Sequence, residues 1–324
     1  MVPGLSQPLL PQSISDSDPS TSSTFQFQDS LKNLILSAFS KAILSNFNRI
    51  VIHFLILFSL NLPSPPHILG LYIAKLSDQN LAYNTIKNHV SAIATLHKIF
   101  DHSDPSNSFL IQKALSGLSR TSPPPKKLLP ITKELLPSLV NALARLPLDN
   151  YNFTLFKALI LISYYACLRV GEAVLSADSK HTLQFDQISF LPSPLGLTLR
   201  IKFNSFKHSS SPSVLDFPSL RDNPVCPVKA LSDYLAIRPQ SNGNLFIKSC
   251  GSPVTRAIFV DILKNSVKFI GLDPLLFNSH SLRSGRATDL ALEGYSEAII
   301  KMAGRWHSSA YQQYIRVTSS TFKS

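Results

Sequence analysis

The sequence contains only three cysteines among its 324 residues: Cys167, Cys226 and Cys250. They are widely spaced, odd in number and form no C-x-x-C pair, so they fit neither a disulfide framework nor a zinc site. We therefore expect a protein of a reducing compartment.

Long apolar runs are also missing. The most apolar stretches, residues 51–62 and 155–168, are shorter than the roughly 20 residues of a membrane-spanning helix, and they are interrupted by His53 and Lys157. Both stretches predict buried helices, and we expect no membrane partner. The N-terminal residues have no basic start followed by an apolar run, so they predict no secretory signal and a protein that is not secreted.

Acidic side chains are scarce. The chain has 31 Lys and Arg against 19 Asp and Glu, a formal net charge of +12, although charged residues make up only 15% of it. This excess favours a polyanionic partner, with nucleic acid a better candidate than a membrane surface. A merely basic protein is the alternative. Hydrophobic residues, at 44%, suffice for about two folded domains of roughly 150 residues each.

Composition and pattern divide the chain into four parts. Residues 1–28 are rich in Ser, Pro, Asp and Thr and predict a flexible arm. Residues 29–119 predict a helical domain, because apolar residues recur there at helical spacing. Residues 120–130 contain three consecutive prolines and predict an extended linker. Residues 131–324 form a second predicted domain.

The second domain is predicted to be mostly helical with one small sheet. In residues 197–203, apolar and polar residues alternate as in a half-buried strand. Gly294 and Gly304 are predicted to end the last two helices. Strands are predicted for 183–190, 196–203 and 213–217. Helices are predicted for 131–146, 152–175, 227–237, 255–271, 281–294 and 296–304. The predicted fold class is therefore mainly α with a small antiparallel β-sheet.

Four short motifs in the second domain contain residues suited to phosphate chemistry. The motifs are LRVGEA, which is predicted to close a long apolar helix, SFKHS between two strands, HSLR, and GRWHSSAYQQYIR. In chain order, their polar and aromatic residues are Arg169, Glu172, Lys207, His280, Arg283, Trp306, His307 and Tyr314. Each motif alone is common, because surface ion pairs and packed tyrosines explain most such residues. Their order along the chain makes them informative.

In this order, ACLRVGEAV, FNSFKHSS, HSLRSGRAT and GRWHSSAYQQYIR resemble the motifs of the tyrosine recombinases, or phage integrases, particularly the versions carried by eukaryotic mobile elements. The resemblance covers residues 29–316. In the second half it rests on the four motifs, and in the first half only on the arrangement of a helical domain followed by a linker. It implies a core-binding domain in 29–119 that grips DNA and a catalytic domain in 131–324. It also implies double-stranded DNA as the partner, a homotetramer on that DNA, and no cofactor or metal. A nuclear location follows for a eukaryotic source, and a cytoplasmic one otherwise.

The resemblance implies a role for each matching residue. Tyr314 is the nucleophile that attacks a DNA phosphodiester and forms a 3′-phosphotyrosine, and Lys207 protonates the departing 5′-oxygen. Arg169 and Arg283 bind the non-bridging oxygens, because planar guanidinium groups offer paired donors to a phosphate. The assisting residues are His280 as acid or base, Trp306 where other members have a histidine, and Glu172 as support for Arg169 or the neighbouring helix.

Three assignments have a rival nearby in the sequence. The pairs are Trp306 and His307, Tyr314 and Tyr311, and Lys207 and Lys202. The first of each pair is favoured. The tryptophan directly follows a Gly-Arg dipeptide, the tyrosine begins the family's Y-x-R ending, and the lysine lies in a loop, whereas its rival occupies a solvent-facing position of a strand.

Several basic residues are candidates for contacts with the DNA backbone, which attracts cations regardless of sequence. In the helix predicted for 84–100, the stripe Ile86, Val90, Ile93 and His97 predicts the buried face, and two lysines lie outside it. A solvated polar face is the alternative explanation for each candidate. The candidates are Lys87 and Lys98 in this helix, Lys126 and Lys127 in the linker, and Arg256, Lys264 and Lys268 in a later helix.

The resulting hypothesis is a site-specific recombinase or integrase that cuts and rejoins DNA. A covalent intermediate keeps the energy of the broken bond, so this chemistry needs no ATP. Two alternatives are a mobile-element-derived protein that binds DNA without cutting it, and a type IB topoisomerase with the same chemistry.

Overall fold

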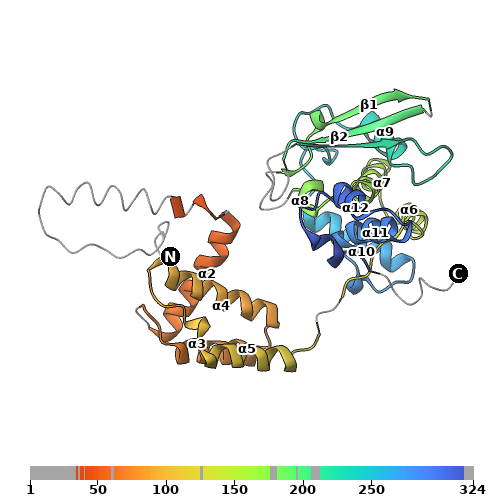
Figure 1. The fold of residues 1–324 in the computed structure, drawn as a ribbon. Coiled ribbons are helices and arrows are strands. Elements are labelled where there is room, and N and C mark those ends of the chain that lie inside the picture. Colours follow the sequence, from red (N-terminus) through yellow and green to blue (C-terminus); the bar gives the residue numbers. More distant parts are fainter. Residues whose placement is uncertain are drawn as a thin grey trace, which may run out of the picture. The chain divides into compact units, whose positions relative to one another are not determined.

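The structure is a computed structural model that describes residues 34–35, 37–39, 41–59, 62–124, 127–175, 181–194, 196–205 and 212–316. The chain divides into two compact units, Met1–Pro125 and Lys126–Ser324. Figure 1 shows helices in the first unit, and helices beside a small sheet in the second. The predicted fold class, mainly α with a small antiparallel sheet, is confirmed. Among the described residues, no helix has both the length and the apolar content needed to cross a bilayer.

The described part of the first unit is helical. Pro66 begins one helix, at a position where the missing N–H of proline costs nothing. Ser108 caps another, because its Oγ accepts the Ile111 N–H at 3.4 Å. That last helix was not predicted separately. The elements are α2 (Lys41–Phe58), α3 (Pro66–Asp78), α4 (Tyr83–Ile99), the 3₁₀ turn η1 (Pro105–Asn107) and α5 (Phe109–Thr121).

Helix α4 buries the stripe that its sequence predicts. Ile86, Val90, Ile93 and His97 are all buried. The His97 side chain is satisfied inside the unit, since its Nε2 accepts the Ser64 backbone N–H at 3.0 Å and its Nδ1–H donates to the Ile93 carbonyl at 2.8 Å. A backbone N–H can only donate, so these two bonds fix the neutral tautomer. His97 is therefore a core residue of this unit.

The second unit surrounds a central helix, α7 (Asn150–Tyr165). Almost every residue of α7 from Leu155 onward is buried, and the helix packs against α6, α9 and α11. A helix that is apolar on all sides belongs in a core, as its composition predicts. The other helices are α6 (Leu136–Leu143), α8 (Val170–Ala173), α9 (Pro227–Ile237), α10 (Arg256–Phe269), α11 (Ser279–Leu292) and α12 (Glu297–Gly304). The 3₁₀ turns are η3 (Phe185–Gln187), η4 (Pro274–Leu276) and η5 (Ser309–Gln313).

The sheet of the second unit is antiparallel, with β2 in the middle. The strands, in spatial order, are β1 (Ile188–Ser193), β2 (Gly196–Phe203) and β3 (Ser213–Pro218). β2 has the predicted bounds, and its Ile201 lies opposite Ile188 of β1. Every second residue from Leu199 to Phe203 is buried, whereas Lys202 is exposed. The alternation in the sequence therefore located this strand correctly.

The first strand, Ile188–Ser193, begins and ends later than the predicted 183–190. Leu183 and Phe185 pair with a different segment: the Leu245 N–H donates to the Leu183 carbonyl, and the Phe185 N–H donates to the Gly243 carbonyl, both at 2.8 Å. The chain then turns through η3 before β1 begins. The predicted start was wrong because these backbone groups are satisfied outside the sheet.

The long helix predicted for 152–175 is in fact two helices. Cys167 adopts a left-handed conformation with a φ of 47°, and the Leu168 N–H donates to the Ser163 carbonyl at 2.9 Å. This is the hydrogen bond of a Schellman ending, which stops α7 before the predicted end. Arg169 is consequently not the end of an apolar helix but the residue that precedes the first turn of α8.

Gly304 does not end α12 in the predicted way. The left-handed residue after this helix is Arg305, with a φ of 54°, and Gly304 is still helical. A Cβ on Gly304 would lie 1.7 Å from the Trp306 ring, so close packing is what requires a glycine here. Gly294 does follow α11 in the left-handed conformation, with a φ of 79°, as predicted.

An extended segment at the start of the second unit is tied to α11. The Ile131 N–H donates to the Ser281 carbonyl at 2.8 Å, and the Lys133 N–H donates to the Asp289 carboxylate at 2.8 Å. A Cβ on Gly285 would lie 1.7 Å from the Ile131 carbonyl oxygen, so only a glycine admits this approach. These contacts hold in place the helix that carries HSLR.

Candidate active site

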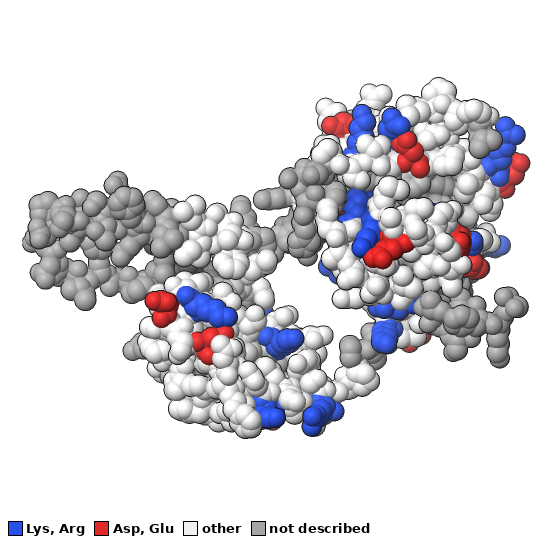
Figure 2. Space-filling view, viewed as in Figure 1, with Lys and Arg blue, Asp and Glu red and all other residues white. Residues whose placement is uncertain are grey.

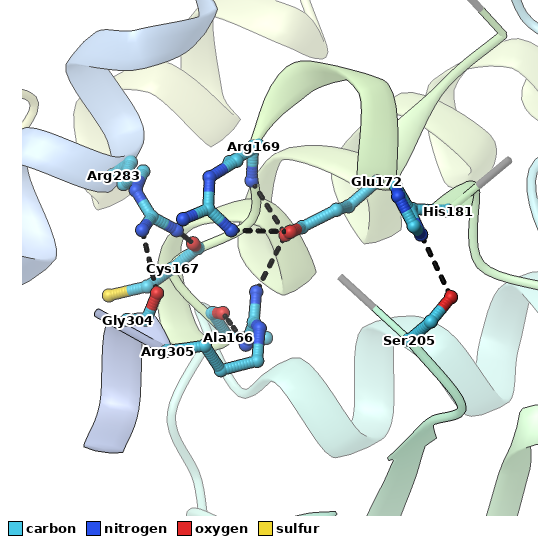
Figure 3. Close-up of polar contacts among 9 residues, drawn as sticks. All are labelled: Ala166, Cys167, Arg169, Glu172, His181, Ser205, Arg283, Gly304 and Arg305. Carbon is cyan, nitrogen blue, oxygen red and sulfur yellow. Dashed lines mark hydrogen bonds and ion pairs between the residues drawn. The ribbon is translucent and has the colours of Figure 1, made fainter. Parts of the chain in front are cut away.

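The motifs that the sequence singled out meet in the second unit. Helix α8 and the residue before it contribute Arg169 and Glu172, α11 contributes His280 and Arg283, and the chain after α12 contributes the aromatic residues. Figure 3 shows arginines from these three places pointing toward one another. The arginine that belongs to the end of α12 is Arg305, which we had not predicted as a site residue.

Arg283 is completely buried and held on several sides. Its Nη1 donates to the Cys167 carbonyl, and its Nη2 donates to the Gly304 carbonyl at 2.6 Å. The guanidinium carbon lies 4.1 Å from the centroid of the Trp306 ring and 5.2 Å from that of Tyr314. Burial, and then the charge of Arg169, lower the pKa of Arg283 to about 10, which leaves it charged at neutral pH.

Arg169 is fixed by a carboxylate three residues further along the chain. Its backbone N–H and its Nη1 both donate to Glu172, each at 2.9 Å. The Arg169 side chain keeps 19% of its surface exposed, whereas Glu172 keeps 2%. The guanidinium is therefore anchored at one edge and partly reachable from solvent.

Glu172 also binds Arg305, which lies deeper in the unit. The Arg305 Nη2 donates to Glu172 Oε2 at 2.6 Å, and its Nη1 donates to the Ala166 carbonyl at 3.0 Å. Burial alone raises the pKa of Glu172, but the charges of Arg305, Arg169 and Arg283 outweigh it and hold that pKa below its ordinary value. The carboxylate is therefore ionised at neutral pH between two of the arginines.

His280 lies in the first turn of α11, one turn before Arg283. Its backbone N–H donates to Asn278 Oδ1 at 2.7 Å, which caps the helix. Burial, and then the charges of Arg283, Arg256 and Arg169, lower the pKa of His280. The imidazole is therefore neutral at pH 7, with one nitrogen able to accept a proton.

Trp306 forms the centre of a small aromatic cluster after α12. Its ring centroid lies 5.2 Å from that of Tyr314 and 6.4 Å from that of Tyr311. The indole Nε1 is buried and has no hydrogen-bond partner among the described residues. The cluster presents a ring face to Arg283 and contains one buried indole donor that no described residue satisfies.

The segment that carries Tyr314 is fastened to α11 through its backbone. The Thr288 Oγ1 accepts the Arg316 N–H at 2.9 Å and lies 3.5 Å from the Tyr314 carbonyl oxygen. The hydroxyl of Thr288 also donates to the Ser284 carbonyl within α11 at 2.8 Å. The segment that carries Tyr314 is therefore fastened to α11, the helix that contains Arg283.

The structure separates the aromatic rivals by burial. Trp306 is buried against Arg283, whereas the neighbouring His307 is exposed. Tyr311 is buried under Trp306, with its ring near the ammonium of Lys301, whereas Tyr314 keeps part of its surface exposed. Tyr311 is thus packed inside the cluster, and Tyr314 lies at its partly exposed edge.

Lys207 lies outside the described residues. The loop between β2 and β3 is described as far as Ser205, whose Oγ shares a hydrogen bond of 2.8 Å with His181 Nδ1. Figure 3 shows this pair beside the arginine cluster. The rival Lys202 is exposed on β2, between buried Ile201 and Phe203.

The lysines proposed for DNA contact are exposed where they are described. They are Lys87 and Lys98 on α4 and Lys127 before α6, whereas Lys126 lies outside the described residues. Lys98 also forms an ion pair of 2.9 Å with Asp104. On α10, Arg256 and Lys268 are exposed and Lys264 is half-buried. Figure 2 shows Lys and Arg side chains spread over the visible faces of both units, several of them beside Asp or Glu.

Two curated relatives are similar to this chain in sequence, and no family model matches it. An integrase/recombinase XerD homolog of Selenomonas ruminantium is 26% identical over 246 residues, which cover 71% of this chain and 67% of the relative. Tyrosine recombinase XerD of Halalkalibacterium halodurans is 27% identical over 270 residues, which cover 78% of this chain and 77% of the relative.

Solved structures share the fold at lower identity. The XerH site-specific recombinase bound to palindromic difH, in a post-cleavage complex, matches with a TM-score of 0.56 and 15% identity, over 78% of this chain and 69% of that one. A lambda integrase dimer bound to a COC′ core site matches with a TM-score of 0.54 and 12% identity, over 93% of this chain and 81% of that one. The protein thus has the fold of the tyrosine recombinases, and both of these relatives in sequence carry recombinase names.

Proposed function

We propose that this protein is a site-specific DNA recombinase that cuts and rejoins DNA through a 3′-phosphotyrosine intermediate. The observation that carries the proposal is the position of Tyr314, whose ring centroid lies 5.2 Å from the guanidinium carbon of the buried Arg283. A tyrosine fixed beside a buried cation, with a second arginine nearby, suits attack on a phosphodiester. The recombinase names of the relatives support the same chemistry.

Arg169 and Arg283 bind the two non-bridging oxygens of the scissile phosphate in this proposal. Negative charge on these oxygens grows as the nucleophile approaches, and guanidinium groups fixed in advance stabilise it without further reorganisation. Arg283 is held by two carbonyl groups and two rings, and Arg169 by Glu172, so both guanidinium groups are anchored before DNA binds. Arg283 is completely buried, so DNA binding has to make it accessible to the phosphate. The Trp306 indole N–H is a third donor for the phosphate.

The proposed reaction exchanges one phosphorus–oxygen bond for another. The Tyr314 hydroxyl gives its proton to the neutral His280, acting as the base, and its oxygen bonds to phosphorus, while the bond from phosphorus to the 5′-oxygen of the next nucleotide breaks. That 5′-oxygen takes up a proton from Lys207 and leaves as a hydroxyl, and His280, neutral at pH 7, handles a proton near the same phosphate. A 5′-hydroxyl of another strand reverses these steps and releases the tyrosine.

The first unit acts as the core-binding domain in this proposal, with 120–130 as linker and 131–324 as the catalytic domain. Lys87, Lys98, Lys126 and Lys127 contact backbone phosphates of double-stranded DNA. The functional assembly is a homotetramer on two DNA segments. A source in a eukaryotic mobile element, and with it a nuclear location, rests on the motifs HSLRSGRAT and GRWHSSAYQQYIR.

The test is covalent capture of DNA in the absence of metal. The purified chain is incubated in EDTA with nicked duplexes from the DNA that flanks its own gene, then separated on a denaturing gel. We expect a slow protein–DNA band that is absent with Tyr314→Phe and retained with Tyr311→Phe, the matched control. Salt-sensitive binding to a defined site without any such band would instead indicate a DNA-binding protein that does not cut.

A further inference from the structure

Arg305 is a buried arginine that the proposed chemistry does not use directly. Its side chain is only 1% exposed, and its backbone adopts the left-handed conformation with a φ of 54°, which glycine accommodates far more easily. The side-chain contacts of Arg305 have to offset the cost of this backbone conformation. The contacts of that side chain indicate what it does.

The side chain of Arg305 joins elements that are far apart in the sequence. Its guanidinium binds Glu172 of α8 and the carbonyl of Ala166 at the end of α7. Its guanidinium carbon also lies 3.9 Å from the centroid of the Phe203 ring, at the last residue of β2. In the chain, Arg305 lies between two residues that contact Arg283. The carbonyl of Gly304 accepts a hydrogen bond from Arg283, and the ring of Trp306 covers its guanidinium.

Glu172 shares its charge between two arginines because of this arrangement. The Glu172 Oε2 accepts both the Arg169 backbone N–H and the Arg305 Nη2, and Oε1 accepts the Arg169 Nη1. With Arg305 in place, one carboxylate faces two guanidinium groups, and a positive charge is left over at the exposed edge of Arg169. Without Arg305, the buried carboxylate would neutralise Arg169 alone, and its freed oxygen could draw that guanidinium inward.

We propose that Arg305 is a positioning residue for DNA cleavage: it compensates Glu172, so that the charge and donors of Arg169 remain available to the scissile phosphate. This inference rests on the proposed recombinase function. Arg305 performs this task without contacting the phosphate itself.

The decisive comparison uses single and double variants. Arg305→Met removes the charge at similar volume, and we expect it to slow single-turnover formation of the covalent complex at saturating DNA by roughly 100-fold, as for loss of a preorganised donor. Glu172→Gln added to Arg305→Met removes the uncompensated carboxylate. The double variant should form the covalent complex at least about tenfold faster than Arg305→Met, because Arg169 is then no longer neutralised.

Controls separate this role from simple destabilisation. Arg238 is a matched buried arginine whose guanidinium donates to backbone carbonyls such as that of Leu245 at 2.9 Å and lies 4.7 Å from the centroid of the Phe185 ring, so Arg238→Met should lower the unfolding temperature without a comparable loss of rate. DNA affinity of the Arg305 variants should stay within about threefold of wild type, since the other cations proposed to contact phosphates are unchanged. If Arg305→Met does not fold, Arg305→Gln replaces it, because glutamine is also neutral, with the same expected rescue by Glu172→Gln.

The outcomes are distinct. The proposal is overturned if the double variant forms the covalent complex more slowly than Arg305→Met does. It is also overturned if Arg305→Met, per folded molecule, loses no more rate than Arg238→Met does. Either result would mean that Arg305 is only structural. If the wild-type chain forms no covalent complex, the recombinase function itself fails, and the role of Arg305 fails with it. That result is read before any variant is made.

Discussion

The indole ring of Trp306 covers the Arg283 guanidinium, whose central carbon lies 4.1 Å from the ring centroid. This contact replaces solvent with an aromatic face on one side of a buried cation, a favourable arrangement for both groups. It also depends on Gly304, since any larger residue there would collide with the ring. The pair defines one wall of the candidate active site.

Replacing Trp306 tests whether the indole N–H serves the reaction. Trp306→Phe keeps an aromatic face but loses the donor, and we expect cleavage to slow by roughly 10- to 100-fold while the fold persists. Trp306→Ala should in addition lower the free energy of unfolding by about 3 kcal/mol, through the cavity it leaves. Single-turnover rates and thermal unfolding measure both effects. A larger rate loss for His307→Ala than for Trp306→Phe would exchange the roles of these neighbours.

Replacing either proposed phosphate-binding arginine by lysine tests the need for a planar group with paired donors. Arg169→Lys and Arg283→Lys should each slow cleavage by about 100- to 1,000-fold, because an ammonium group cannot reproduce the guanidinium fork. Arg200→Lys is the matched control, since Arg200 only pairs with Asp216 across the exposed face of the sheet. Cleavage rates near wild type in either active-site variant would refute the assigned contacts.

The lowered pKa of His280 predicts a pH dependence of stability. An unfolded chain has a histidine pKa near 6.5, so below about pH 6.5 the unfolded state binds a proton that the folded His280 still excludes. Stability contributed by the neutral His280 is thus present above that pH and is lost as pH falls. Unfolding temperatures at about pH 7.5 and about pH 5.5 should differ more for wild type than for His280→Gln. Equal differences would mean that His280 is not shielded from protonation.

The surroundings of Gly285 and Gly117 predict opposite effects when each glycine is replaced by alanine. Gly285→Ala places a methyl group on the Ile131 carbonyl and should destabilise the second unit by about 2 kcal/mol or more. Gly117→Ala in α5 meets no atom within 4 Å and should stabilise the first unit by about 0.5–1 kcal/mol. Denaturant unfolding of each variant measures the two changes. A neutral Gly285→Ala would show that the extended segment can leave α11 at little cost.

The exposed Lys87 predicts a specific change in the salt dependence of DNA binding. If Lys87 neutralises one phosphate, Lys87→Ala should reduce the slope of log affinity against log salt by about 0.9 and weaken binding to all sequences alike. Lys229→Ala is the control, because Lys229 pairs with Asp233 at 3.1 Å on α9. An unchanged slope for Lys87→Ala would assign this lysine to the solvated face of α4.

Sequence patterns located the elements whose side chains repeat regularly. The alternation in β2 and the apolar stripe of α4 were predicted correctly, because periodicity directly reports which face is buried. The end of α7 was missed because Cys167 occupies the left-handed position after the helix. That position usually holds a glycine, which would have marked the helix end in the sequence. The start of the first strand was missed because its backbone pairs with residues 243–245, far along the chain.

The motifs identified Arg169, Glu172, His280, Arg283, Trp306 and Tyr314, which the structure brings together. Arg305 was overlooked because a single arginine after a helix carries no periodic signal. Nothing in the sequence indicated that Glu172 is buried between two arginines. Its second partner lies 133 residues further along the chain, and only the folded structure shows that pairing.

The most direct test of the account identifies the residue that carries the DNA. A trapped covalent complex is digested with trypsin, and the peptide Trp306–Arg316, which contains both Tyr311 and Tyr314, is fragmented in a mass spectrometer. The account predicts a nucleotide joined through its 3′-phosphate to Tyr314 and a free 5′-hydroxyl on the other DNA end. A nucleotide on Tyr311 or on any other residue, or a 5′-phosphate linkage, would contradict it.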